Sequence, residues 1–198
     1  MNVDGFDVGW LRAMLEDRYL VWRLKRGSGP ALCRIYTRYE SDLLTLAMNL
    51  LGRADQAEDV LQDVFMKFIE SIDEFELTGS LKGYLATCVA NRARDYLRKD
   101  RGRRTANGRL PPEDFHPDRR IVAGPVESAI AGEQRERLVV ALAELPYVQR
   151  EAVLLHLRGG LTFREIAPVQ GVSAKTAESR YRYALNKLRS LMNGQVET

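Results

Sequence analysis

Apolar residues recur at intervals of three and four along nearly the whole chain. The clearest run lies between residues 55 and 72, where the apolar positions are Ala57, Val60, Leu61, Val64, Phe65, Phe68, Ile69 and Ile72. This spacing places all of them on one broad face of an α-helix. Alternation of apolar and polar residues, which is typical of strands, is missing from the sequence. The pattern therefore predicts an all-α protein, with helices over residues 8–26, 31–51, 55–72, 81–101 and, interrupted at Pro146, 127–158.

Glycine and proline residues divide these helices into two groups. The sequence GSGP at 27–30 separates the first two helices, and Gly52 follows the second as a C-cap residue. Between residues 101 and 125, glycine and proline are frequent and apolar periodicity is weak, which is typical of a flexible linker. We expect two all-helical domains, residues 1–104 and 127–198, joined by a linker over 105–126.

The C-terminal fifty residues carry the pattern of a helix-turn-helix. Thr162 stands three residues before Glu165, as in a capping box, so a helix should begin at Phe163. Gly171 and Ser173 then predict a turn and the N-cap of a further helix. That helix has one apolar face, made of Ala177, Tyr181, Ala184, Leu188 and Leu191. A short helix, a turn and a basic second helix indicate binding to duplex DNA.

Charge is spread unevenly, although the formal net charge is only +3. Residues 53–76 contain two basic and eight acidic side chains, a local charge of −6. Residues 86–104 contain seven basic and two acidic side chains, and residues 173–190 contain five and one, giving +5 and +4. Two basic segments and one acidic helix suggest two nucleic-acid surfaces and one surface for a protein partner.

The acidic helix carries a methionine on its polar face. That face, opposite the apolar stripe, consists of Asp59, Gln62, Asp63, Met66 and Glu70. A solvated acidic face is the simpler interpretation, but an exposed methionine among carboxylates favours a contact surface.

The basic helix, residues 81–101, is predicted to turn Leu81, Leu85, Cys88, Val89 and Tyr96 inward. Its other side would carry Thr87, Ala90, Asn91, Arg94, Arg98 and Arg101. Arginines one turn apart can follow a phosphate backbone, asparagine can read a base edge, and Phe75 in the preceding loop can stack on an unpaired base. The alternative is a basic C-terminal turn that complements the helix dipole and needs no ligand.

Catalytic and metal chemistry finds no support in the sequence. Cys33 and Cys88 are far apart, without a CxxC motif, and we expect both to be buried free thiols in a reducing cytoplasm. His116 and His156 have no second ligand at a useful spacing and are expected to be structural or solvated. We expect no enzyme activity, no cofactor, no metal and no small-molecule substrate. The first residues lack the pattern of a signal peptide and no apolar run is long enough to span a membrane, so we expect a cytoplasmic protein without membrane insertion.

The motifs, in this order, resemble those of the bacterial sigma-70 family, in its small two-domain extracytoplasmic-function (ECF) group. DRYLV at 17–21 and ALCRIY at 31–36 are similar to its opening helices, and AEDVLQDVFMKFI at 57–69 to its polymerase-binding segment. GSLKGYLATCVANRARDYLRK at 79–99 resembles its segment for promoter melting and minus-ten recognition. LPYVQREAVLLHLRGGLTFREIA at 145–167 and GVSAKTAESRYRYALNKLR at 171–189 resemble region 4, which binds the minus-thirty-five element.

The resemblance implies an alternative sigma factor that directs core RNA polymerase to promoter DNA, contacts its β′ clamp and β flap, and is held inactive by an anti-sigma factor. The residues implied at the β′ clamp are Asp59, Gln62, Asp63 and Met66. At the minus-ten element they are Phe75, Leu81, Thr87, Asn91, Arg94 and Arg98. At the minus-thirty-five element they are Lys175, Thr176, Glu178, Ser179, Arg180, Arg182, Tyr183 and Asn186.

Some positions depart from the family pattern. Leu81 and Tyr84 replace a frequent phenylalanine and tryptophan, and Glu178 and Tyr183 stand where basic residues are common. Pro168 lies inside the first helix of the helix-turn-helix, which predicts a short or bent helix. Two other interpretations stay open: a helix-turn-helix regulator that acts without core polymerase, and a sigma mimic that only binds an anti-sigma factor.

Overall fold

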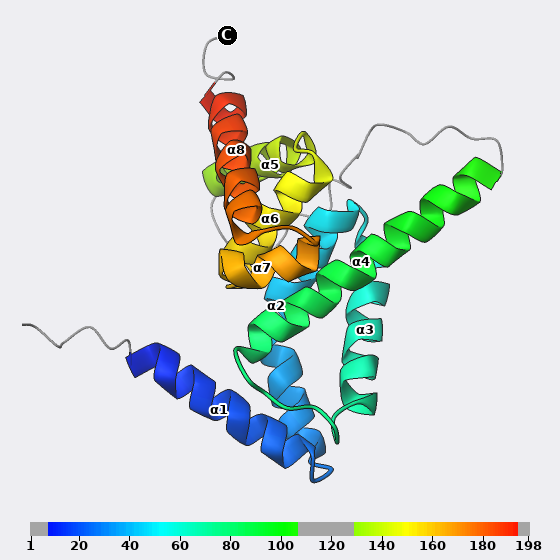
Figure 1. The fold of residues 1–198 in the computed structure, drawn as a ribbon, viewed down its shortest axis with the longest axis vertical. Helices are drawn as coiled ribbons and strands as arrows, with labels where there is room; N and C mark the ends of the chain where they lie inside the picture. The colour runs from blue at the N-terminus through cyan, green and yellow to red at the C-terminus, as the bar shows by residue number, and fades with distance from the viewer. Residues whose placement is uncertain (1–7, 107–128, 194–198) are drawn as a thin grey trace, which may run out of the picture.

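The structure is a computed structural model that describes residues 8–106 and 129–193. Within these ranges it consists of eight α-helices and contains no strand (Figure 1). The helices are α1 (Val8–Leu24), α2 (Gly29–Leu51), α3 (Ala54–Glu70), α4 (Leu81–Ala106), α5 (Ala129–Ala143), α6 (Tyr147–Leu157), α7 (Phe163–Gln170) and α8 (Ala174–Asn193). The predicted all-α class is confirmed.

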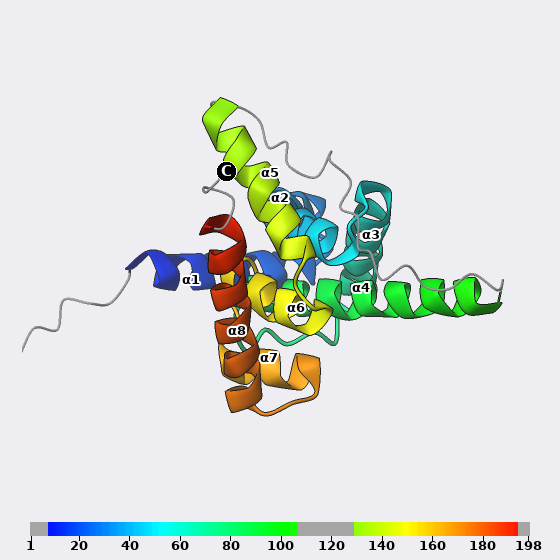
Figure 2. The same cartoon turned by 90° about the horizontal axis from the view of Figure 1, so that it is seen from above.

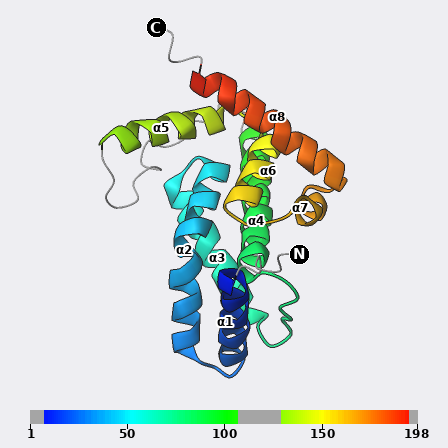
Figure 3. The same cartoon turned by 90° about the vertical axis from the view of Figure 1, so that its left-hand side faces the viewer.

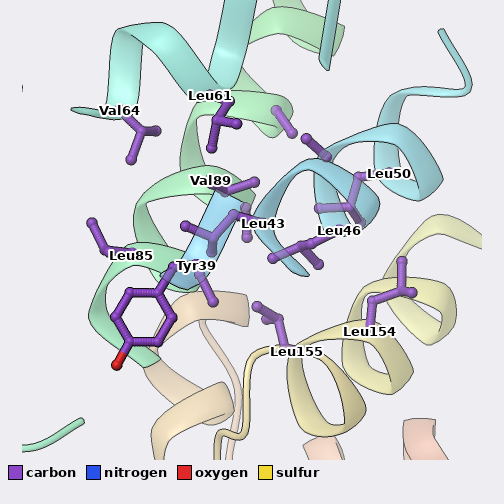
Figure 4. Packing of buried hydrophobic residues seen from close by; sticks show 14 of the residues in the cluster. Tyr39, Leu43, Leu46, Leu50, Leu61, Val64, Leu85, Val89, Leu154 and Leu155 are labelled. Atoms are coloured by element: carbon purple, nitrogen blue, oxygen red, sulfur yellow. The ribbon is translucent and has the colours of Figure 1, made fainter. Parts of the chain in front are cut away.

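Helices α1–α4 form an N-terminal unit around α2. The inner face of α2 carries Leu43, Leu46 and Leu50, which are at most 1% exposed and pack against α3 and α4 (Figure 4). Gly52 ends α2 in the left-handed conformation, with φ 75°, and its N–H donates to the carbonyl of Met48 at 2.7 Å. Left-handed backbone is accessible to glycine without steric cost, so the sequence signal for this helix end is correct.

A buried polar contact fixes α1 against α2. The Tyr39 hydroxyl donates to both carboxylate oxygens of Asp17, at 2.6 and 2.7 Å, and Arg38 lies 3.5 Å from the same carboxylate. Burial raises the pKa of Asp17 above its ordinary value, while the Tyr39 hydroxyl and the Arg38 charge act in the opposite direction. Desolvation of a carboxylate therefore outweighs its two favourable partners at this contact.

Helices α5–α8 form a C-terminal unit in which α8 runs across α6 and α7 (Figure 2). An aromatic cluster joins the three: His156 of α6 stacks on Phe163 of α7 at 4.7 Å, and Tyr181 of α8 meets both rings. The Nδ1 atom of His156 lies 2.8 Å from the carbonyl oxygen of Leu161. His156 is thus a structural residue, one of the two roles expected for it.

The two units share one hydrophobic core. The C-terminal unit sits on one end of the N-terminal unit, with α7 beside α4 (Figure 3). Leu154 and Leu155 of α6 point towards Leu46 of α2 and belong to the same buried cluster (Figure 4). The predicted two-domain chain therefore packs as one body in this arrangement.

The end of α4, the burial of Ala90 and the exposure of the two cysteines differ from the sequence predictions. Helix α4 continues to Ala106, two residues into the predicted linker, because a single glycine such as Gly102 costs only about 1 kcal/mol in a helix of good helix formers. Residues 107–126 of that linker lie outside the described ranges. Ala90, predicted to face outward, is fully buried, because α6 and α7 of the other unit pack against α4. Cys33 is exposed, not buried, whereas Cys88 is half-buried.

Candidate functional surfaces

The polar face of α3 presents Asp59, Gln62 and Met66 to solvent. Met66 is 53% exposed, which is high for a large apolar side chain. Gln62 and Met66 also line a surface groove between α2 and α3, together with Tyr36, Glu40, Leu44, Glu58, Leu61, Phe65 and Ile69. The arrangement combines an apolar floor with carboxylates at its rim, as in contact surfaces for proteins.

Asp63, the fourth residue expected on this face, has a partner within its own unit. Its Oδ2 atom accepts hydrogen bonds from both Nε (2.9 Å) and Nη2 of Arg92 on α4. A charge-assisted pair of this kind holds α3 in register with α4. Sequence spacing could not predict this contact, because the two residues lie on different helices and 29 positions apart.

An aromatic cluster supports the loop between α3 and α4. Phe75 packs edge-on against Phe68 at 5.2 Å and lies 4.6 Å from the ring of Tyr84. Leu81, expected at the DNA contact, has no exposed surface. It anchors the start of α4 in the core, so its side chain offers nothing to a ligand in this conformation. Phe75 is half-buried.

The outer side of α4 carries the polar residues expected there, in different environments. Asn91 and Arg98 are exposed, and Arg98 forms a surface ion pair with Asp95 at 3.0 Å. Thr87 is half-buried and donates to the carbonyl of Gly83 at 2.9 Å. Arg94 is bonded to Glu151 of α6 at 2.6 Å. The side chain of Arg101 lies outside the described residues.

The helix-turn-helix has the local geometry that its sequence predicts. The Thr162 hydroxyl accepts from the Glu165 N–H, and the Glu165 carboxylate accepts from the Thr162 N–H at 2.7 Å, completing the capping box. Helix α7 then runs for only eight residues, with Pro168 inside it, as expected for a short helix. Gly171 ends it with φ 64°, and the Ser173 hydroxyl caps α8 by accepting from the Thr176 N–H at 3.1 Å.

The outer face of α8 is open to solvent over most of its length. The exposed residues of the expected set are Lys175, Thr176, Glu178, Arg182, Tyr183 and Asn186. Ser179 and Arg180 are half-buried, and Arg180 donates to the side-chain oxygen of Gln170 at 2.9 Å. Tyr183 is 61% exposed. A basic, hydrogen-bonding face on the second helix of a helix-turn-helix is suited to a DNA major groove.

Glu151 is a buried carboxylate that the sequence patterns did not single out. It is 1% exposed, and its two oxygens accept from Arg94 at 2.6 Å and from Gln170 at 3.0 Å. A carboxylate followed by the apolar run AVLL predicts a buried partner, but the partner cannot be identified from spacing, since Arg94 is 57 positions away.

The described residues contain no group of three potential metal ligands. None of the helices in 8–106 and 129–193 combines the length and apolarity needed to cross a membrane.

Two family models match the chain in sequence order. Sigma-70 region 2 matches residues 35–103, and Sigma-70 region 4 matches residues 135–188. The chain is 27% identical over 175 residues to the ECF RNA polymerase sigma factor SigK of Mycobacterium ulcerans, covering 88% of this chain and 92% of the relative. It is 29% identical over 151 residues to the ECF RNA polymerase sigma factor EcfG of Rhodopseudomonas palustris, covering 76% and 78%.

Two solved structures share the fold. The sigma factor RpoE in complex with the anti-sigma factor NepR from Bartonella quintana matches with a TM-score of 0.65 and 25% identity, over 81% of this chain and 95% of that one. CnrH in complex with the cytosolic domain of CnrY matches with a TM-score of 0.64 and 23% identity, over 90% and 98%.

Proposed function

This chain belongs to the sigma-70 family of RNA polymerase sigma factors, in its ECF group, and we propose that three of its surfaces divide the work of promoter recognition. It is an alternative sigma factor, which binds core RNA polymerase and directs transcription initiation at promoters.

The face of α3 docks on the β′ clamp of the polymerase. Asp59 and Gln62 supply polar contacts, and Met66 supplies apolar area that is still exposed. Asp63 contributes indirectly to this interface, because its hydrogen bond with Arg92 of α4 holds α3 in position. Helices α5–α8 sit near the β flap, which would carry them to the upstream part of the promoter.

The loop before α4 and the exposed side of that helix bind the minus-ten element. Phe75 and its aromatic neighbours line the loop, Asn91 is placed to read a base edge, and Arg94 and Arg98 are one turn apart, as needed to follow a strand. Capture of an extruded base offsets the few kcal/mol that unstacking costs. Because only certain bases fit the loop, duplex opening then depends on the DNA sequence of the promoter.

The exposed face of α8 enters the major groove at the minus-thirty-five element. Arg182 and Lys175 provide positive charge, and Thr176, Ser179 and Asn186 provide hydrogen-bonding groups. Glu178 is exposed on the same face and can accept a hydrogen bond from cytosine N4, so the base preference there should favour cytosine.

The observation that carries this proposal is the pairing of two unlike surfaces on the N-terminal unit. Exposed Met66 among carboxylates on α3 suits a protein partner, whereas the arginines of α4 suit nucleic acid. A regulator that acts without polymerase would leave the face of α3 without a role. We also place the chain in the cytoplasm, assign it no catalytic role of its own, and infer an anti-sigma factor as a partner because RpoE of B. quintana has one.

Transcription in vitro tests the proposal directly. Core polymerase would be incubated with a genomic template with and without this chain, and RNA 5′ ends would be mapped. We expect new start sites that share two sequence elements at fixed spacing and that vanish without the chain. Binding to the same sites without polymerase, and no new starts, would indicate a conventional regulator. Binding to an anti-sigma factor with neither activity would indicate a sigma mimic.

A further inference from the structure

Tyr183 is an aromatic side chain that faces solvent on the outer side of α8. It is 61% exposed, and among residues 8–106 and 129–193 no hydrogen bond, ion pair or ring contact engages it. Tyr181, two positions earlier, has a different environment, because its ring centroid lies 4.9 Å from that of His156 and 5.3 Å from that of Phe163. Tyr181 therefore supports the fold of the C-terminal unit, whereas the ring of Tyr183 is available to a ligand.

The two cations next to Tyr183 on the helix surface already have hydrogen-bond partners. Arg180, three residues before it, donates to the side-chain oxygen of Gln170 at 2.9 Å. Lys187, four residues after it, donates to the carbonyl oxygen of Glu144 at 2.6 Å. Residues three and four positions apart are neighbours along one side of a helix. This side of α8 therefore offers a ligand an aromatic ring, flanked by two cations that are bound to groups of their own unit.

The other side of the same face has the chemistry of a phosphate contact. Lys175 and Arg182 are exposed and lie seven residues apart, which is about two turns along one side of α8. Successive residues of an α-helix are rotated by about 100°, so Tyr183 lies about a quarter turn around the helix from Arg182. In a major groove, a helix that directs its cations to the phosphates therefore turns the ring of Tyr183 towards the base edges.

Thymine is the base that an aromatic ring can select in the major groove. It presents a C5 methyl group there, whereas the other three bases present hydrogen-bond donors and acceptors without a methyl group. Apolar side chains contact this methyl group, while guanine is read by the paired donors of an arginine. A ring that lies on the base-facing side of the helix should thus favour thymine.

We propose that Tyr183 is a specificity-determining residue at the upstream promoter element, where its ring packs against the C5 methyl group of a thymine. The inference rests on the proposed function of α8 and adds the base that is read on this side of the helix. Glu178, for which cytosine is expected, lies five residues earlier and therefore about 140° away around the helix. The two side chains should accordingly read different base pairs.

Selection from a pool of random DNA duplexes would test the base preference. The full chain, with and without core polymerase, would be used as wild type, Tyr183→Phe, Tyr183→Ala and Tyr183→Arg, and the bound duplexes would be sequenced. We expect the wild type and Tyr183→Phe to enrich thymine at one position, and Tyr183→Ala to lose this enrichment. Tyr183→Arg should instead favour guanine there by at least about fivefold.

The matched control is Tyr19→Ala, because Tyr19 is another tyrosine with about half of its surface exposed (52%), but on α1. It should enrich the same thymine as the wild type. Helical content by circular dichroism would verify that each variant is folded.

Deoxyuridine would test the methyl group itself, because uracil is thymine without the C5 methyl. Fluorescence anisotropy would measure binding to the selected duplex and to the same duplex with deoxyuridine at the selected position. Loss of one buried methyl group should raise the dissociation constant of the wild type about fourfold. Tyr183→Ala should bind the two duplexes equally well.

Three results would overturn the inference. The first is equal thymine enrichment, or no enriched duplex at all, with the wild type and with Tyr183→Ala. The second is unchanged affinity of the wild type for the deoxyuridine duplex. The third is loss of the thymine preference in Tyr183→Phe, which would assign it to the hydroxyl group and not to the ring. Failure of the proposed function would be seen separately, as absence of new start sites in the transcription assay while the selected thymine still depends on Tyr183.

Discussion

Replacing Met66 by alanine should weaken core-polymerase binding without unfolding the chain. Full burial of an apolar side chain of this size contributes about 1.5–3 kcal/mol. Since Met66 is 53% exposed, about half of that remains to be gained at an interface, roughly 0.8–1.6 kcal/mol. The dissociation constant should therefore rise about four- to fifteenfold.

Fluorescence anisotropy with labelled protein and purified core polymerase would measure this change. Met66→Leu is the control, because leucine keeps nearly the same apolar volume and should bind within about twofold of the wild type. Asp63→Arg is a poorer probe, since it replaces the bond to Arg92 by two like charges and would disturb the packing of α3 on α4. A Met66→Ala protein that is folded and binds polymerase as well as the wild type would refute the assignment of this face to the β′ clamp.

Three further changes test other parts of the molecule. Thr162→Ala removes the hydroxyl of the capping box and should lower the free energy of unfolding by about 1 kcal/mol in urea titrations, whereas Thr162→Ser should retain most of it. Arg182→Ala should weaken binding to the mapped promoter duplex and lower the slope of log Kd against log salt by about one; an unchanged slope would remove Arg182 from the phosphate contacts. Burial raises the pKa of Asp17, so the folded wild type loses stability as pH rises through that raised value, while Asp17→Asn does not titrate. The stability of Asp17→Asn relative to wild type should therefore increase as pH rises from the ordinary aspartate range through the raised pKa of Asp17, and parallel pH curves would contradict this.

Local sequence signals were sufficient for the caps of the helix-turn-helix and for the end of α2 at Gly52. Thr162, Glu165, Gly171 and Ser173 each act on backbone groups within four residues, so their spacing alone specifies the caps that the structure shows. The buried apolar face of α3 could likewise be predicted, because helical periodicity is a property of the segment itself.

Side-chain contacts between segments that are distant in sequence could not be predicted from local spacing. The bonds from Arg92 to Asp63 and from Arg94 to Glu151 join residues far apart in the chain, and both arginines looked like neighbours on one basic helix. Ala90 was placed outward for the same reason: a periodic pattern shows which face is polar but not which unit packs against it. Only the tertiary arrangement shows that Arg94 is engaged while Arg98 faces solvent.

The shared core has a consequence for how the chain unfolds. Leu154 and Leu155 contribute to the same buried cluster as Leu43 and Leu46, so the two units support each other thermally while they are packed together. Melting of the compact chain should then be a single cooperative transition. A chain whose two units were held apart would depend on two smaller cores, and that form would be more open to proteolysis than the compact one. Resistance to proteolysis should therefore report how far the two units remain packed together.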